Sequence, residues 1–148
     1  EDKMDKVAKN LYMCTDDGSY GFHGNVTVML DELVTNRGME YDQAIVIGPM
    51  IMMKFACLAT KKLNIPTIVS LNTIMVDGTG MCGACRISIG DDVKFACVDG
   101  PEFDGWLVNF DEAMKRQQMF KSEEGRKILR KQDGPTHSSP NCQIGGKH

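Results

Sequence analysis

One short stretch constrains this chain more than any other, because an aspartate and three cysteines fall between residues 77 and 97 at fixed intervals. Four residues separate Asp77 from Cys82, and two more precede Cys85. Eleven further residues lead to Cys97. This is the ligand spacing of a plant-type iron-sulfur loop with aspartate in the first position. The spacing therefore predicts a metal site held by these four side chains.

Glycines accompany the four candidate ligands. Gly78, Gly80 and Gly83 can adopt positive φ and have no Cβ to collide with an inorganic core. They also let successive backbone amides turn inward, as anion-binding loops require. The composition of the loop thus fits a chain that wraps closely around a metal centre.

A β-hairpin is expected to deliver the last ligand. Residues 86–89 and 93–96 alternate apolar and polar side chains, and Gly90-Asp91-Asp92 between them has turn chemistry. Such a hairpin would bring Cys97 back beside Cys85.

Three other interpretations of the cysteines compete with a cluster. A thioredoxin-like redox pair normally begins a helix, whereas Cys82-x-x-Cys85 lies between glycines and leads into a strand. A structural zinc held by three thiolates and a carboxylate is chemically possible, although none of the histidines (His23, His137 and His148) is near in sequence. Cysteines that merely fill a core explain their concentration, together with three glycines, poorly.

Composition bounds the remaining possibilities. The 148 residues, 42% of them hydrophobic, suffice for one modest domain, and a net charge of −3 gives no footprint for nucleic acid. No apolar run reaches membrane-spanning length, and no signal peptide opens the chain. The cysteines, including Cys14 and Cys57 in apolar surroundings, suit a reducing cytosol, so a cytoplasmic location is expected. Because Glu1 begins inside a charged helical pattern, we expect a fragment.

The pattern of the chain predicts an α/β fold: a partial doubly wound, three-layer parallel nucleotide-binding domain, then a small iron-sulfur hairpin subdomain and a C-terminal helix. The parallel unit is expected to comprise a strand at 11–14, a helix at 24–36, a strand at 43–47, a helix at 50–63 and a strand at 67–71. The predicted boundaries are 1–72 for the nucleotide-binding half, 73–106 for the cluster hairpin, 107–132 for the helical segment and 133–148 for a disordered tail.

The C-terminal part carries three further expectations. Residues 99–106 are rich in turn formers and should cover the hairpin, and residues 111–131 should form an amphipathic helix interrupted near Gly125. Cys142 in the tail is expected to be a free thiol. Met81, inside the ligand loop, could shield a cluster or touch a partner.

Residues 71–85 and 95–105 together resemble the C-terminal cluster segment of the ferredoxin-NADP reductase-like family. In the group of its members that are small subunits of NADH-dependent ferredoxin:NADP oxidoreductases, one Asp and three Cys hold a 2Fe-2S cluster. The resemblance assigns these roles to Asp77, Cys82, Cys85 and Cys97. Electron-transfer subunits of dihydroorotate dehydrogenase have Cys in place of Asp77, so the aspartate favours the first group.

Two loops resemble those that approach the nicotinamide nucleotide in this family, although they could simply be good turns. The candidate residues are Asp16, Asp17, Gly18 and Ser19 in one loop and Gly48, Pro49 and Met50 in the other. The family's FAD-binding barrel and its Gly-rich first strand-turn-helix have no counterpart here. The resemblance therefore implies at best a partial NAD(P) site, FAD only in the intact protein, and no hydride transfer by this polypeptide alone.

The function implied by the resemblance is electron transfer. The chain would relay single electrons through a 2Fe-2S cluster between the flavin of an NAD(P)H-dependent oxidoreductase and a larger partner subunit. The alternative is a zinc-stabilised interaction module on a nucleotide-binding-like scaffold. Neither nucleic acid nor a membrane is an expected partner.

Overall fold

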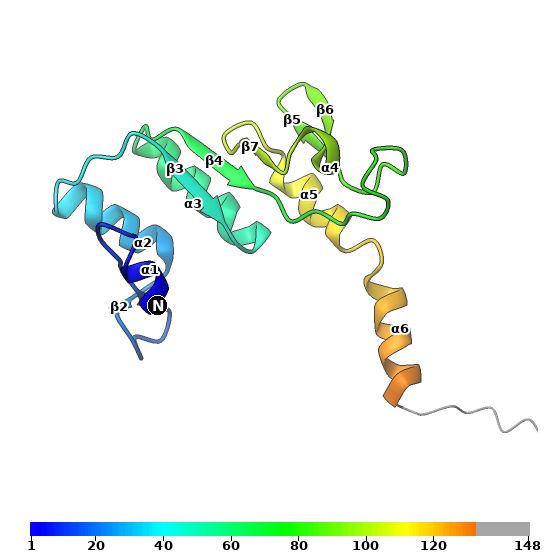
Figure 1. Ribbon diagram of the computed structural model, residues 1–148, viewed down its shortest axis with the longest axis horizontal. Helices are drawn as coiled ribbons and strands as arrows, with labels where there is room; N and C mark the ends of the chain where they lie inside the picture. The colour runs from blue at the N-terminus through cyan, green and yellow to red at the C-terminus, as the bar shows by residue number, and fades with distance from the viewer. Residues whose placement is uncertain (133–148) are drawn as a thin grey trace, which may run out of the picture.

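The computed structural model describes residues 1–132, which form a mixed α/β arrangement with three small sheets (Figure 1). The elements before the central sheet are α1 (Asp2–Asp5), β1 (Cys14–Thr15), β2 (Phe22–His23), α2 (Val26–Asp31) and the π-helical turn η1 (Glu32–Asn36). They are followed by β3 (Ala44–Ile47), α3 (Met50–Lys62), β4 (Thr67–Ser70), β5 (Arg86–Ile89), β6 (Asp92–Phe95), α4 (Ala96–Asp99), β7 (Glu102–Asp104), α5 (Phe110–Gln117) and α6 (Lys121–Gln132).

The central sheet has the strand order β3-β4-β7. Strands β3 and β4 are parallel, with Ala44 opposite Thr67, and α3 makes the crossover between them. This part of the predicted βαβ pattern is confirmed within a residue of its expected bounds. Strand β7 pairs antiparallel with β4, with Phe103 opposite Val69. The segment that was expected to be a turn-rich cover thus extends the sheet.

Helix α3 packs one face onto this sheet. Pro49 begins it with a fixed φ, and Asn64 ends it with a φ of 55°. Its buried side chains recur three or four residues apart and meet strand and hairpin residues in one apolar core. The fully buried members of that core are Met53, Val69 and Ile87.

The described residues cover only one face of the sheet. Val46 packs against the core, whereas its neighbours on the opposite face, Ile45 and Ile47, are 67% and 71% exposed. The mixed α/β class is confirmed, and the doubly wound three-layer arrangement stays a prediction.

The first expected strand differs from the prediction in its partner. Cys14–Thr15 pairs in parallel with Phe22–His23 in a separate two-stranded sheet. The backbone explains this placement, because the amide of Phe22 donates to the Met13 carbonyl at 2.8 Å and that of Gly24 donates to the Thr15 carbonyl at 3.0 Å. The strand's hydrogen bonds are therefore made within its own loop.

The C-terminal segment forms two helices rather than one interrupted near Gly125. Phe110 and Ala113 are buried and fix α5 on the core, and the chain turns between Gln117 and Lys121. Gly125 lies inside α6, which extends away from the rest of the molecule (Figure 1). The tail expected at 133–148, with Cys142, lies outside the described residues. No helix within residues 1–132 has both the length and the apolar composition to cross a membrane.

Candidate metal centre

The carboxylate of Asp77 organises the loop that contains the first three candidate ligands. Its Oδ1 accepts a hydrogen bond from the Thr79 amide at 2.8 Å, and its Oδ2 accepts one from the Cys82 amide at 3.1 Å. The bond from Thr79, assisted by that from Cys82, holds the pKa of Asp77 below its ordinary value. The Asp77 carboxylate is therefore an anionic oxygen donor at neutral pH, and it is held next to the backbone of Cys82.

The glycines adopt the conformations that the sequence predicted. Gly78, Gly80 and Gly83 have φ angles of 76°, 84° and 63°. A Cβ on Gly80 would lie 3.0 Å from Val98 Cγ2, whereas one on Gly78 would meet nothing within 4 Å. Both positions require left-handed backbone, and Gly80 additionally requires a bare Cα because the loop lies against α4.

The hairpin brings the last candidate ligand back as predicted. Strands β5 and β6 pair antiparallel, and the amide of Ala96 donates to the Cys85 carbonyl at 3.2 Å. The Cys85 and Cys97 sulfurs then lie 3.2 Å apart. The hydrogen bond with the Cys85 thiol is the main cause that raises the pKa of Cys97. Cys97 lies in the short helix α4 rather than in the strand.

The contacts group the four predicted ligands into two pairs of different kinds: the Asp77 carboxylate accepts the backbone amide of Cys82 and does not meet its sulfur, whereas the Cys85 and Cys97 sulfurs are in direct contact. Two thiolates on one tetrahedral metal with bonds of about 2.3 Å lie roughly 3.8 Å apart, so a small outward shift would let the second pair share an iron. Within residues 1–132, no group of three or more His, Cys, Asp or Glu side chains is arranged to hold a single metal ion. One carboxylate and three thiols are donors whose chemistry fits an iron-sulfur centre.

Exposure differs between the two cysteines of the Cys-x-x-Cys motif. Cys85 is 1% exposed and contributes to the core, whereas Cys82 is exposed. The Cys82 sulfur accepts the amide of Ala84 at 3.5 Å, the kind of N–H contact that steadies a thiolate. The centre would therefore have one protected side and one side open to solvent or to a partner.

The two loops predicted to approach a nucleotide meet at one surface. Asp16 and Pro49 line a cavity of about 430 Å³ together with Asn25 and Met52. A neighbouring cavity of about 390 Å³ shares Asp16, Asn25 and Met52 with it. The structure therefore brings one residue of each predicted loop together, and Asn25 and Met52 are among the lining residues that the sequence analysis did not select.

The other predicted nucleotide residues have structural roles. Asp17 accepts the Ser19 amide at 3.0 Å, a bond that lowers the pKa of Asp17, and Gly18 turns the loop with a φ of 70°. The Gly48 backbone meets Met52, and Met50 is buried in the core, so its side chain does not face the cavity. Asn25 could have been found from sequence, because it caps α2 by accepting the amides of Thr27 and Val28.

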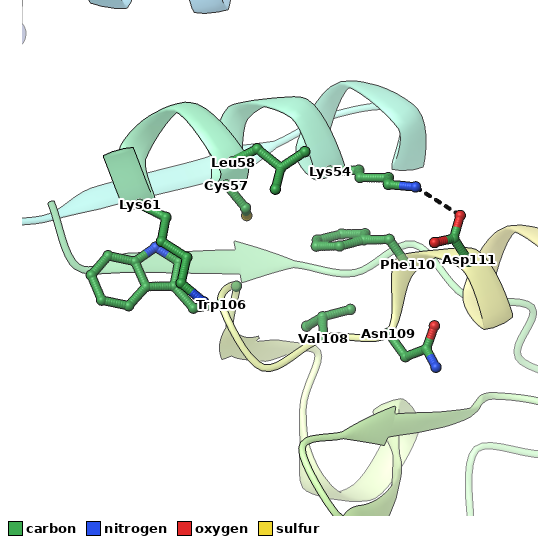
Figure 2. A pocket seen from close by; sticks show the side chains of 10 residues that line it. Lys54, Cys57, Leu58, Lys61, Trp106, Val108, Asn109, Phe110 and Asp111 are labelled. Atoms are coloured by element: carbon green, nitrogen blue, oxygen red, sulfur yellow. Dashed lines mark hydrogen bonds and ion pairs between the residues drawn. The ribbon is translucent and has the colours of Figure 1, made fainter. Parts of the chain in front are cut away.

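A third cavity, of about 190 Å³, lies between α3 and the connection from β7 to α5 (Figure 2). Lys54 reaches across from α3 and donates to Asp111 at 2.7 Å (Figure 2). Burial, with a smaller contribution from the charge of Asp104, raises the pKa of the Cys57 thiol at this cavity to about 11. A thiol held protonated at neutral pH is a packing group rather than a nucleophile. We therefore interpret this cavity as part of the packing between α3 and the connection from β7 to α5.

Comparison with known proteins places these observations in a family context. Residues 72–109 match the family described as the iron-sulfur cluster binding domain of dihydroorotate dehydrogenase B. This range contains all four candidate ligands, the hairpin and β7.

Curated relatives extend the similarity beyond the loop. An uncharacterized protein in the adh 3' region of Clostridium beijerinckii is 63% identical over 99% of this chain and 49% of its own length. A homologue of the electron transfer subunit of dihydroorotate dehydrogenase B from Thermotoga maritima is 48% identical over 80% of this chain and 42% of its own. The chain thus spans about half the length of the curated relatives it matches.

A solved structure supports the same relationship. A chain of the NADH-dependent reduced ferredoxin-NADP oxidoreductase, studied for flavin-based electron bifurcation, superposes with a TM-score of 0.75 at 43% identity and covers 88% of this chain and 47% of that one. The resemblance inferred from the cluster segment is therefore confirmed: the chain is similar to proteins named as electron transfer subunits of dihydroorotate dehydrogenase B and to a chain of the NADH-dependent reduced ferredoxin-NADP oxidoreductase, and its residues 72–109 match the iron-sulfur cluster binding domain of the former.

Proposed function

We propose that this chain carries single electrons through a 2Fe-2S cluster held by Asp77, Cys82, Cys85 and Cys97. The observation that carries the proposal is that the hairpin brings the Cys85 and Cys97 sulfurs into contact, while the Asp77 carboxylate holds the glycine loop through the Cys82 backbone amide. When bound, such a cluster supplies one-electron oxidation and reduction. The residues themselves act as ligands, and none of them is needed as a general acid, base or nucleophile.

The electron donor in this proposal is a flavin in the intact oxidoreductase, which converts a nicotinamide hydride into single electrons. The acceptor is a larger subunit of the same oxidoreductase. Relatives named as electron transfer subunits support this assignment. Met81, 89% exposed beside the open side of the loop, is the candidate contact for that partner. The cytoplasmic location expected from the cysteines remains part of the proposal.

Anaerobic reconstitution of the 148-residue chain tests the cluster. We expect iron and acid-labile sulfide in equal amounts, a brown protein, and an electron paramagnetic resonance signal on one-electron reduction. Single variants Cys82→Ala and Cys97→Ala should lose most of the iron, whereas Cys14→Ala, outside the loop, should keep it. A colourless protein with stoichiometric zinc would contradict the proposal and favour the zinc-stabilised interaction module.

We also propose that the surface lined by Asp16, Asn25, Pro49 and Met52 is part of a nicotinamide nucleotide site. The two adjoining cavities, with short polar side chains and a helix N-cap at their rim, support it. Titration of the ¹⁵N-labelled chain with NAD⁺ and NADP⁺ should move the amide signals of residues 15–19 and 24–27 in preference to those of α5. Equal shifts throughout the chain, or none, would contradict this assignment.

A further inference from the structure

Helix α5 holds the candidate metal loop through two adjacent residues. Arg116 Nη2 donates to the Gly83 carbonyl at 2.8 Å and to the Ala84 carbonyl at 3.3 Å. Gly83 and Ala84 are the residues between the two cysteines of the Cys-x-x-Cys motif. Gln117 Nε2 donates to the Asn72 carbonyl at 2.9 Å, at the start of the segment that leads to Asp77. One helix therefore fixes both the entry to the loop and its centre.

The anchorage of α5 makes this contact firm. Phe110 and Ala113 are 6% and 2% exposed and pack in the central core. Asn109 caps the helix by accepting the Glu112 amide at 3.1 Å, and its own amide donates to the Ser88 carbonyl at 2.9 Å in the hairpin. The position of Arg116 is therefore set by the core and the hairpin, independently of the loop that it contacts.

The charge of Arg116 has no carboxylate partner among the described residues. The ion pairs formed by side chains within residues 1–128 are Arg37 with Glu32, Lys54 with Asp111 and Lys94 with Asp92. Arg116 Nε is buried without a hydrogen-bond partner in that part of the chain, and Arg116 lines with Thr73 a cavity of only about 10 Å³, room for at most about one water molecule. Because a partly buried cation without a counter-charge is costly, negative charge nearby should stabilise it.

Thiolates at Cys82 and Cys85, which flank the carbonyls that Arg116 contacts, would supply that negative charge. We propose that Arg116 is the positioning residue of the metal loop: its guanidinium clamps the Gly83–Ala84 backbone between two ligands, and its charge offsets theirs. Of these two roles, only the charge effect rests on the proposed function. The clamp is present in the protein without a cluster, whereas the charge effect requires one.

Two variants of the full chain separate the clamp from the charge. Arg116→Gln removes the charge and has a side chain too short to bring its nitrogen to the Nη2 position, and Arg116→Lys keeps the charge but lacks the planar guanidinium and is also shorter than arginine, so it should not reproduce the contact of Nη2 with both carbonyls. Lys115→Gln is the matched control, because it removes one positive charge from the next residue of the same helix, where the side chain is exposed.

The first measurement is hydrogen exchange of the metal-free protein. We expect the amides of residues 83–86 to exchange at least tenfold faster in both Arg116 variants and to be unchanged in Lys115→Gln. The second is the reduction midpoint of the reconstituted protein. It should fall in Arg116→Gln, because a nearby positive charge favours the reduced form, and should stay close to the wild-type value in Arg116→Lys and Lys115→Gln.

Unchanged exchange in both Arg116 variants would overturn the clamp. A midpoint that falls equally in Lys115→Gln would overturn the specific charge effect. A wild-type chain that takes up no cluster would overturn the proposed function and the charge effect with it, while the exchange data would still decide the clamp. If Arg116→Gln failed to fold, Arg116→Lys would decide between the outcomes.

Discussion

The sulfur atoms of Cys85 and Cys97 lie 3.2 Å apart, because Cys85 directly precedes β5 and Cys97 follows β6 in α4, so both flank the open end of the hairpin. Because the two sulfurs are already in contact, and only roughly 1.2 Å of further approach separates them from disulfide bonding distance, we predict that the metal-free protein forms a Cys85–Cys97 disulfide on oxidation in air. Cys82 should remain free to react with iodoacetamide. Mass spectrometry of unreduced peptides checks this, and a Cys82–Cys85 disulfide as the main product would contradict it.

The two loop glycines should respond differently to a methyl group. Gly78→Ala should cost about 1 kcal/mol of unfolding free energy, because alanine disfavours the left-handed region. Gly80→Ala should cost about 1 kcal/mol more, because its Cβ would also press on Val98. Urea unfolding of the metal-free variants gives both values.

A second substitution isolates the contact from the backbone strain. Val98 is 59% exposed, so Val98→Ala alone should change stability little. In the double variant with Gly80→Ala it should restore the part of the loss caused by the contact. Strictly additive losses would show that the two side chains do not interact.

Asp77 offers a test of how the carboxylate tunes the proposed cluster. A carboxylate is a harder donor than a thiolate and places less electron density on iron. Asp77→Cys should therefore retain iron and lower the reduction midpoint, as measured by an anaerobic redox titration. Asp77→Ala, which also removes the acceptors for the Thr79 and Cys82 amides, should retain less iron. An unchanged midpoint in Asp77→Cys would show that the carboxylate does not tune the cluster.

Because burial raises the pKa of the Cys57 thiol, we predict that the protein loses stability at alkaline pH. Its folded pKa of about 11 lies above the ordinary thiol value of 9.0. The folded chain therefore holds this proton between those values while the unfolded chain releases it, and stability falls as pH rises through that range. The contribution is at most about 3 kcal/mol.

The measurement is urea unfolding of the wild type and Cys57→Ala at two pH values, about 8 and about 10.5, which enclose most of the range between the unfolded and folded pKa values of Cys57. Other groups also titrate in this range, so the informative quantity is the difference between the two proteins. The wild type should lose more stability than the variant. Parallel losses would contradict burial of the protonated thiol.

The sequence predicted the elements whose signals are local. Alternation and turn residues predicted the hairpin that returns Cys97, and the apolar and basic pattern of residues 50–63 predicted α3. It did not predict the pairing of β7, because Glu102–Asp104 is only three residues long and its partner β4 lies about thirty residues earlier in the chain. Nor did it predict the position of the break before α6. A single glycine such as Gly125 is a weak helix breaker, and the tertiary contacts of α5 decide where the helix ends.

The candidate site divides in the same way. The ligand spacing and the glycines could be identified from sequence, since both are short-range requirements of a loop around a metal. The role of Arg116 could not, because one arginine among the charges of an amphipathic helix carries no sign of its partner. Met50 shows the converse limit: its neighbours suggested a ligand loop, but its side chain is 3% exposed in the core.

Within the described residues, β3 pairs with β4 along one edge and has no strand on the other. Ile45 and Ile47 stand on the uncovered face of the same strand. An open strand edge beside exposed isoleucines is a template on which further chains can add. The apparent molar mass of the 148-residue chain, measured by light scattering, should accordingly rise with protein concentration. The measurements above are therefore best made in dilute solution.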